Sequence, residues 1–231
     1  MAKTLLIAGK EFPGGAAFAS ASQAFQRNVA LTTDAGTGKT EQGKLHLLEW
    51  RKHSPVAARS LIVETENLYQ KIDEAVLFFD APWFAGRYPA LKTQICAHAL
   101  DDMITGYMLL TSELLTHFER GGLRLIFVLR EIDFTGAGEK QPVYRAGDEA
   151  LPAAGAGAFR AFAEKIADKL ASSRTVSALL IEADALTGDA DLSGWLFPYI
   201  DALPGVSAGN QKNVRWVKYG AKPGGRFPFL R

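Results

Sequence analysis

The chain has 231 residues, and its 26 basic and 25 acidic side chains nearly cancel, which argues against a nucleic-acid-binding or membrane-surface protein. No segment approaches the roughly 18 apolar residues that span a bilayer, and the apolar run 5–8 is too short for a signal peptide. Cys96 has no second cysteine to pair with, and the four histidines lack metal-ligand spacing. We therefore expect a cytoplasmic protein with no metal site, no membrane partner and no nucleic-acid partner.

Short apolar runs alternate with amphipathic stretches along the chain. The runs are continuous in character, which is typical of strands covered on both faces. Their alternation with helical segments predicts an α/β fold: a doubly wound, mostly parallel seven-stranded sheet with helices on both faces, in a single domain spanning 1–231. The predicted strands are 4–8, 28–33, 60–64, 74–80, 124–129, 176–182 and 214–219.

A glycine-rich turn follows the first predicted strand, in the segment "AGKEFPGGAAFASASQAF". The turn is expected to begin at Ala8-Gly9, and a helix of small residues at Gly14-Gly15. In a doubly wound fold, the free N–H groups and the dipole of such a helix favour a pyrophosphate there. The alternative is a tight turn without a ligand, which Pro13 favours because it lacks an N–H donor.

The stretch "LTTDAGTGKT" ends in Gly38-Lys39-Thr40, like the tail of a phosphate-binding P-loop. The P-loop motif requires a glycine four residues before this ending, where this chain has Thr33. The segment that follows, 41–50, is predicted to be a weak helix. We interpret the stretch as a flexible connection after the second strand, with a P-loop hydrolase as an alternative.

Two long helices are predicted at 93–119 and 156–171. The first carries two apolar rows, so that one face covers the sheet and the other packs against another subunit; we therefore expect a homodimer or homotetramer. Gly121-Gly122 is expected to end this helix. The segments 135–142 and 150–158 are predicted to form a mobile loop. The two rows are Ala99, Met103, Tyr107, Leu110, Leu114 and Phe118, and Cys96, Leu100, Ile104, Met108 and Leu115.

Several of these segments resemble the short-chain dehydrogenase/reductase superfamily of Rossmann-fold, NAD(P)-dependent oxidoreductases. "AGKEFPGG" matches the family's glycine turn at Gly9 and Gly15, with Pro13 in place of its middle glycine. "FDAP" matches the family's motif after the fourth strand at Ala81. "YMLLTSELLTHFERGGLRLIFVL" and "AFRAFAEKIADKLASSRTVSALLIEADALTG" are similar to its long helix, fifth strand, next helix and sixth strand, so the resemblance covers most of residues 1–190.

The resemblance implies a Rossmann-like fold, a small-molecule substrate if the chain is active, and NAD or NADP as the cofactor. The loop after the second strand would lie by the ribose, where Asp34 would suit NAD and Lys39 would suit NADP; the choice stays open. The implied cofactor-binding residues are Gly9, Lys10, Gly14, Gly15, Thr33, Asp34, Lys39, Asp80, Ala81 and Pro82.

The sequence departs from the family at its catalytic residues. Pro152 and Ala156 align with the catalytic tyrosine and lysine, the serine position falls near Leu129-Arg130, and the asparagine position falls near Met103. Two functions stay open: an oxidoreductase with a rearranged site, and a catalytically inactive nucleotide-binding or scaffold protein. For a rearranged site, the candidate catalytic residues are Tyr144, Lys140 and Arg130.

Overall fold

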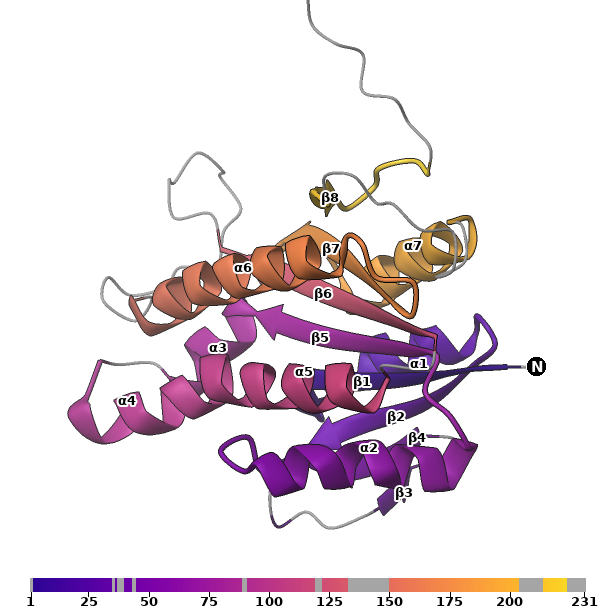
Figure 1. The fold of residues 1–231 in the computed structure, drawn as a ribbon. Coiled ribbons are helices and arrows are strands. Elements are labelled where there is room, and N and C mark those ends of the chain that lie inside the picture. Colours follow the sequence, from indigo (N-terminus) through magenta and orange to yellow (C-terminus); the bar gives the residue numbers. More distant parts are fainter. Residues whose placement is uncertain are drawn as a thin grey trace, which may run out of the picture.

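The computed structural model describes residues 2–34, 36, 40–42, 45–88, 91–118, 122–132, 150–203 and 214–223. These residues form an eight-stranded sheet in the order β3-β4-β2-β1-β5-β6-β7-β8 (Figure 1). Seven strands are parallel and β3 runs antiparallel to β4, which confirms the predicted mostly parallel sheet. The strands are β1 (Lys3–Phe12), β2 (Arg27–Thr33), β3 (Thr40–Gln42), β4 (Leu45–Glu49), β5 (Glu74–Asp80), β6 (Leu123–Glu131), β7 (Val176–Asp184) and β8 (Trp216–Lys218).

Helices cover both faces of the sheet, as the doubly wound architecture requires (Figure 1). Each face has its own buried core. Among the described residues, no helix is long and apolar enough to cross a membrane. One face carries α2 (Pro55–Tyr69), α3 (Ala81–Arg87), α4 (Thr93–Leu100), the π-helical turn η1 (Asp101–Thr105), α5 (Gly106–His117) and α6 (Ala150–Leu170); the other carries α1 (Ala16–Gln23) and α7 (Asp189–Asp201).

The predicted strand 60–64 lies inside α2, and the outer parallel strand is instead β4, in a segment predicted to be a weak helix. The Ser54 hydroxyl caps α2 by accepting a hydrogen bond from the Ala57 amide at 3.2 Å, and Pro55 follows at the start of the helix. The residues that α2 buries recur at the spacing of one helical face, while Val63 is 43% exposed. The predicted strand 60–64 is wrong because the cap and the helical period of the buried residues outweigh the β-branched residues of this segment. The predicted weak helix 41–50 is wrong because β4 pairs with β2.

The stretch after β2 does not lead into the helix that a P-loop requires. β2 ends at Thr33, and the next element is β3, whose Thr40 pairs with Leu47 of β4. This topology contradicts the P-loop alternative. Lys39 itself lies outside the described residues.

The predicted helix 93–119 is a continuous helical stretch that runs through α4, η1 and α5 and ends at His117. All six members of its first apolar row are buried, as predicted. In the second row, Leu100 and Met108 are 52% and 44% exposed. Gly121 lies outside the described residues, and Phe118 occupies the C-cap position.

Residues 150–158 form the first turns of α6, so the prediction of a mobile loop there is wrong. A Cβ on Gly155 would lie 2.7 Å from Met103 Sδ and 3.0 Å from the Phe79 ring. The small residues of this segment therefore let α6 pack closely on η1 and β5. The segment 135–142 lies outside the described residues.

Candidate functional site

The strand order reverses at the junction of β1 and β5. From β1 the sheet extends through β2 and β4 on one side, and through β5, β6, β7 and β8 on the other. In open α/β sheets, ligands bind outside the carboxyl ends of the strands at such a switch point. Three predicted site residues, Lys10, Asp80 and Arg130, lie at the carboxyl ends of β1, β5 and β6.

The glycine turn begins later than predicted. β1 continues to Phe12, and its pairing with β2 shifts register between Ile7 and Phe12. Gly9, with a φ of 104°, adopts a backbone conformation within this shift that other residues rarely reach. The expected turn at Ala8-Gly9 is therefore wrong, because Gly9 bends the strand without ending it. The turn comprises residues 13–15 and leads into α1 as expected.

Each of the three predicted glycines is approached closely by another part of the chain. Gly15 lets α1 approach β1, which is the role that the third glycine has in a dinucleotide-binding turn. Gly9 and Gly14 are approached by aromatic side chains. A Cβ would collide with the Lys10 carbonyl oxygen if added to Gly15, with Tyr107 Oη if added to Gly9, and with the Trp83 ring at 2.7 Å if added to Gly14.

Two backbone N–H groups at the glycine turn already donate hydrogen bonds to nearby carbonyl oxygens of the chain. The Gly15 amide donates to the Glu11 carbonyl oxygen at 3.0 Å, and the Ala16 amide donates to the Pro13 carbonyl oxygen at 3.1 Å. A phosphate at this turn would therefore depend on nearby cations for much of its attraction.

Four charged side chains, which we call the ion quartet, meet at the switch point. Lys10 Nζ lies 2.5 Å from Asp80 Oδ2 and 2.8 Å from both carboxylate oxygens of Asp189. Arg130 donates to Asp80 Oδ2 at 3.1 Å and to Asp189 Oδ1 at 2.6 Å. None of the four side chains is more than 11% exposed. The quartet thus places two buried cations beside the glycine turn, each in contact with both carboxylates.

A second set of charges, the ion chain, extends from Glu11 near the end of β1 toward the end of β2. Lys52 Nζ lies 2.8 Å from Glu11 Oε1 and 3.8 Å from Asp102 Oδ1. Arg87 contacts Asp102 Oδ2 at 3.0 Å and both carboxylate oxygens of Asp34 at 2.9 Å. The ion chain therefore joins the buried end of β1 to the partly exposed Asp34.

Two tyrosines beside the ion chain hold their protons strongly. Burial raises the pKa of Tyr88, whose hydroxyl donates to the Asp102 carboxylate. Burial also raises the pKa of Tyr107, whose hydroxyl donates to the Phe78 carbonyl oxygen at 2.8 Å. The hydrogen bond to Asp34 raises the pKa of Arg87, so this guanidinium remains charged. Neither tyrosine has the lowered pKa of an activated catalytic tyrosine.

Most of the predicted site residues come together at this edge. The Asp80 carboxylate caps α3 by accepting from the Trp83 amide at 3.3 Å, and Ala81 and Pro82 form the first turn of that helix. Thr33 is buried at the end of β2, with Asp34 beyond it. Gly9, Lys10, Gly14, Gly15 and Arg130 surround the ends of β1, β5 and β6. Lys39, Lys140 and Tyr144 lie outside the described residues.

Several charged residues of this edge were not predicted from the sequence. Asp189 stands five residues beyond the end of β7, where the rule that ligands gather at strand ends would have included it. Glu11 belongs to the glycine segment but carries no motif of its own. The remaining residues, Lys52, Arg87 and Asp102, come from a loop and two helices whose positions the sequence does not reveal.

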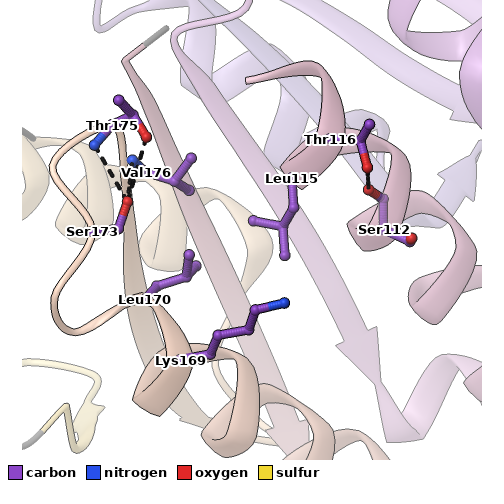
Figure 2. Close-up of a pocket in the computed structure, with 8 residues that line it drawn as sticks. All are labelled: Ser112, Leu115, Thr116, Lys169, Leu170, Ser173, Thr175 and Val176. Carbon is purple, nitrogen blue, oxygen red and sulfur yellow. Dashed lines mark hydrogen bonds between the residues drawn. The ribbon is translucent and has the colours of Figure 1, made fainter. Parts of the chain in front are cut away.

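A separate hollow of about 320 Å³ lies between the ends of α5 and α6 and the start of β7 (Figure 2). Its Ser173 hydroxyl accepts from the Thr175 and Val176 amides at 3.3 and 3.1 Å, and its Thr116 hydroxyl donates to the Ser112 carbonyl oxygen. These hydroxyls therefore serve local turns and helices. Because β7 begins at Val176, the hollow lies at the amino-terminal edge of the sheet, opposite the ion quartet.

No protein-family model matches the sequence. It is 28% identical over 181 residues to an uncharacterized protein of Treponema pallidum (strain Nichols), covering 76% of this chain and 74% of that protein. Within the described residues, no group of three or more His, Cys, Asp or Glu side chains could hold a metal ion.

Similar solved structures are short-chain dehydrogenase/reductases. One is described as a short-chain dehydrogenase/reductase family oxidoreductase from Aeromonas hydrophila subsp. hydrophila. Its TM-score is 0.64 at 12% identity, and the match covers 96% of this chain and 100% of the other. Another is a 3-ketoacyl-(acyl-carrier-protein) reductase from Brucella melitensis complexed with NADH. Its TM-score is 0.57 at 16% identity, and the match covers 79% of this chain and 74% of the other. A third is the actinorhodin polyketide ketoreductase with NADPH. Its TM-score is 0.53 at 15% identity, and the match covers 79% of this chain and 69% of the other. At these identities the likeness shows a shared Rossmann-like fold.

Proposed function

We propose that this chain binds NAD or NADP across the carboxyl ends of β1, β5 and β6, and that its activity is that of an oxidoreductase on a small-molecule substrate. The observation that carries the proposal is the switch point, where Gly15 lets α1 approach β1 beside the buried cations Lys10 and Arg130. The NADH and NADPH named for two of the structural neighbours support the choice of cofactor.

The residues at this edge offer a partner for each polar part of a dinucleotide. Lys10 and Arg130 would hold the diphosphate, and Asp34 would accept hydrogen bonds from the ribose hydroxyls of NAD. Arg87, which contacts Asp34 at 2.9 Å, would instead hold the extra phosphate of NADP. The nicotinamide ring, when bound, donates or accepts a hydride.

Thermal shift with NAD, NADH, NADP and NADPH tests this binding, with ATP as a comparison ligand that carries phosphates but no nicotinamide. A ligand present at 100 times its dissociation constant stabilises the folded chain by about 2.7 kcal/mol. Asp34→Ala should weaken the response to NAD and preserve or improve the response to NADP. An unchanged ratio between the two responses would contradict the role given to Asp34.

The chemistry requires an acid other than the family's tyrosine. Pro152 and Ala156, at the aligned positions, can supply neither a proton nor a positive charge. Positioned acid–base catalysis typically contributes ~10²–10⁴-fold. We assign the proton transfer to Tyr144, with Lys140 four residues before it.

Oxidation of NADH or NADPH in the presence of a panel of ketones and quinones tests this assignment. Tyr144→Phe should lower turnover by about 10²-fold or more. Tyr219→Phe is the matched control, because Tyr219 is 40% exposed, packs on Trp195 and has no role in the proposed site. Turnover that is unchanged in Tyr144→Phe would exclude the displaced tyrosine.

The second candidate function is a catalytically inactive nucleotide-binding or scaffold protein. The self-neutralised ion quartet favours it, because each cation already has two carboxylate partners. Dinucleotide binding without turnover across the substrate panel would support this candidate over the oxidoreductase.

We also propose a homodimer or homotetramer that buries the exposed members of the second apolar row, which lie on α4 and α5. Leu100 and Met108, at 52% and 44% exposure, would lie at the interface. Light scattering of a Leu100→Glu/Met108→Lys variant should show a smaller species than the unaltered chain. Val56→Lys, at an exposed position on α2, is the control. A 25 kDa monomer for the unaltered chain at micromolar concentration would contradict this proposal.

A further inference from the structure

We propose that Lys10 and Arg130 form a diphosphate-binding subsite that Asp189 occupies as an internal anion, and that a ligand's diphosphate binds by displacing Asp189. This inference rests on the location proposed above for the dinucleotide site. It adds the residues that select the ligand's charge and a carboxylate that competes with it.

The contacts of Asp189 are those of an anion held in a cationic site. Its two carboxylate oxygens both lie 2.8 Å from Lys10 Nζ, and Oδ1 also lies 2.6 Å from the Arg130 guanidinium. A lysine ammonium and an arginine guanidinium that converge on one group are a common arrangement for binding phosphates. Arg130 is 5% exposed, and within the described part of the chain its Nε has no hydrogen-bond partner, so the site retains a buried donor that Asp189 does not satisfy.

The other acid of the quartet is fixed by the fold. Asp80 is the last residue of β5, is 1% exposed and caps α3 through the Trp83 amide. Moving Asp80 would uncap a helix and break the end of a central strand. Asp80 therefore remains in place to orient both cations when the other acid leaves.

Asp189 is free of such a structural duty. It is the first residue of α7, whose N-cap is Gly188, and the side-chain hydrogen bonds found for Asp189 join it to Lys10 and Arg130. The other acid in the first turn of α7 is Asp191, whose Oδ2 lies 2.8 Å from the position that a Cβ on Gly188 would take. Displacing the Asp189 side chain thus leaves Asp191 to interact with the helix dipole.

A ligand that displaces Asp189 must compete with a carboxylate of one negative charge, which favours an anion of more than one charge. With both acids in place, two cations and two carboxylates sum to zero. When Asp189 leaves, Lys10 and Arg130 face Asp80 alone, and the site gains one net positive charge. A diphosphate carries at least two negative charges and several acceptor oxygens, so it can replace both contacts of Asp189 and also reach Arg130 Nε.

The direct test compares Asp189→Asn with the unaltered chain in calorimetric titrations with inorganic pyrophosphate. The variant should bind pyrophosphate about 10-fold more tightly, a usual size for coupling between two ligands of one site. Asp191→Asn is the matched control on the same helix turn and should leave the affinity unchanged. Adding Lys10→Met to Asp189→Asn should abolish the gain. Equal pyrophosphate affinity in Asp189→Asn and the unaltered chain would overturn the proposal.

A second measurement uses the unaltered chain and does not depend on the folding of a variant. The Leu192 amide donates to the Gly188 carbonyl oxygen at 2.9 Å in the first turn of α7. The contacts of Asp189 with Lys10 and Arg130 hold this turn against the sheet. If pyrophosphate breaks them, saturating pyrophosphate should speed hydrogen exchange at this amide. Unchanged or slower exchange there would count against displacement.

Titration with NADH and NADPH separates this inference from the function on which it rests. A gain in pyrophosphate affinity without dinucleotide binding in either protein would keep the subsite and reject the dinucleotide function. Dinucleotide binding that Asp189→Asn does not improve would keep the function and reject the role of Asp189. A gain with both ligands supports both.

Discussion

Replacing Lys52 by methionine tests the most deeply buried ion pair at the candidate site. Glu11 is 0% exposed, the Lys52 side chain is 3% exposed, and Lys52 Nζ lies 2.8 Å from Glu11 Oε1. Among the residues that the structure describes, no hydrogen-bond donor satisfies either Glu11 carboxylate oxygen, so this ionic contact compensates the buried charge. Methionine keeps the unbranched stem that packs against Gly106, where an added Cβ would lie 2.7 Å from Lys52 Cβ.

The expected loss follows from leaving Glu11 buried without its partner. Removing one member of a buried pair typically costs about 3–5 kcal/mol, whereas replacing both by apolar residues of similar volume is often neutral or stabilising. Lys52→Met should therefore lower the free energy of unfolding by about 3–5 kcal/mol. The double variant Lys52→Met/Glu11→Met should recover most of that loss.

Urea unfolding followed by circular dichroism measures both free energies, with the slope m as a check on two-state behaviour. Lys71→Met is the control, because Lys71 is 61% exposed and its contact with Asp73 is at the surface. A cost below about 1 kcal/mol for Lys52→Met, well under the range for a broken buried pair, would refute the reasoning. A double variant as unstable as the sum of the two single variants would refute it equally.

Two further perturbations test the glycine turn and the opposite edge of the sheet. Gly15→Ala should destabilise the chain by about 1–3 kcal/mol in thermal unfolding, because its Cβ would collide with the Lys10 carbonyl oxygen; Gly157→Ala, whose Cβ meets nothing within 4 Å in α6, should stabilise by about 1 kcal/mol. The hydrogen bond from Arg27 lowers the pKa of Asp201 to about 2 from an ordinary value of 3.8. This group therefore stabilises the fold fully above about pH 4 and loses its contribution as the pH falls toward 2, so acid titrations should show a smaller fall in stability over that window for Asp201→Asn.

The sequence carries enough information to predict the sheet but not every strand in it. The continuous apolar runs at β1, β2, β5, β6 and β7 mark buried strands wherever they occur. Residues 60–64 form a similar apolar run, yet they belong to α2. The cap at Ser54 and the helical spacing of the buried residues favour the helix there. β4 has only five residues, so its strand character depends on pairing with β2.

Some residues of the candidate site could be predicted from the sequence, and others could not. Gly9, Lys10, Gly15 and Asp80 could be predicted because they lie beside strand ends that are local in sequence. The partners that neutralise them could not, since Asp189 is 179 residues from Lys10 and meets it only through the order of the strands. The ion chain is a further example: Lys52 and Asp102 meet because Gly106 lets the helix approach the Lys52 stem.

The most direct test of dinucleotide binding at the switch point is titration with NADH and NADPH, comparing the unaltered chain with Lys10→Met. Lys169→Met is the matched control, since Lys169 lines the hollow at the opposite edge of the sheet. We expect saturable binding of at least one dinucleotide to the unaltered chain and to Lys169→Met, with a loss of at least about 10-fold in affinity for folded Lys10→Met. No binding to the unaltered chain, or equal affinity in Lys10→Met, would contradict a dinucleotide site at the carboxyl ends of β1 and β5.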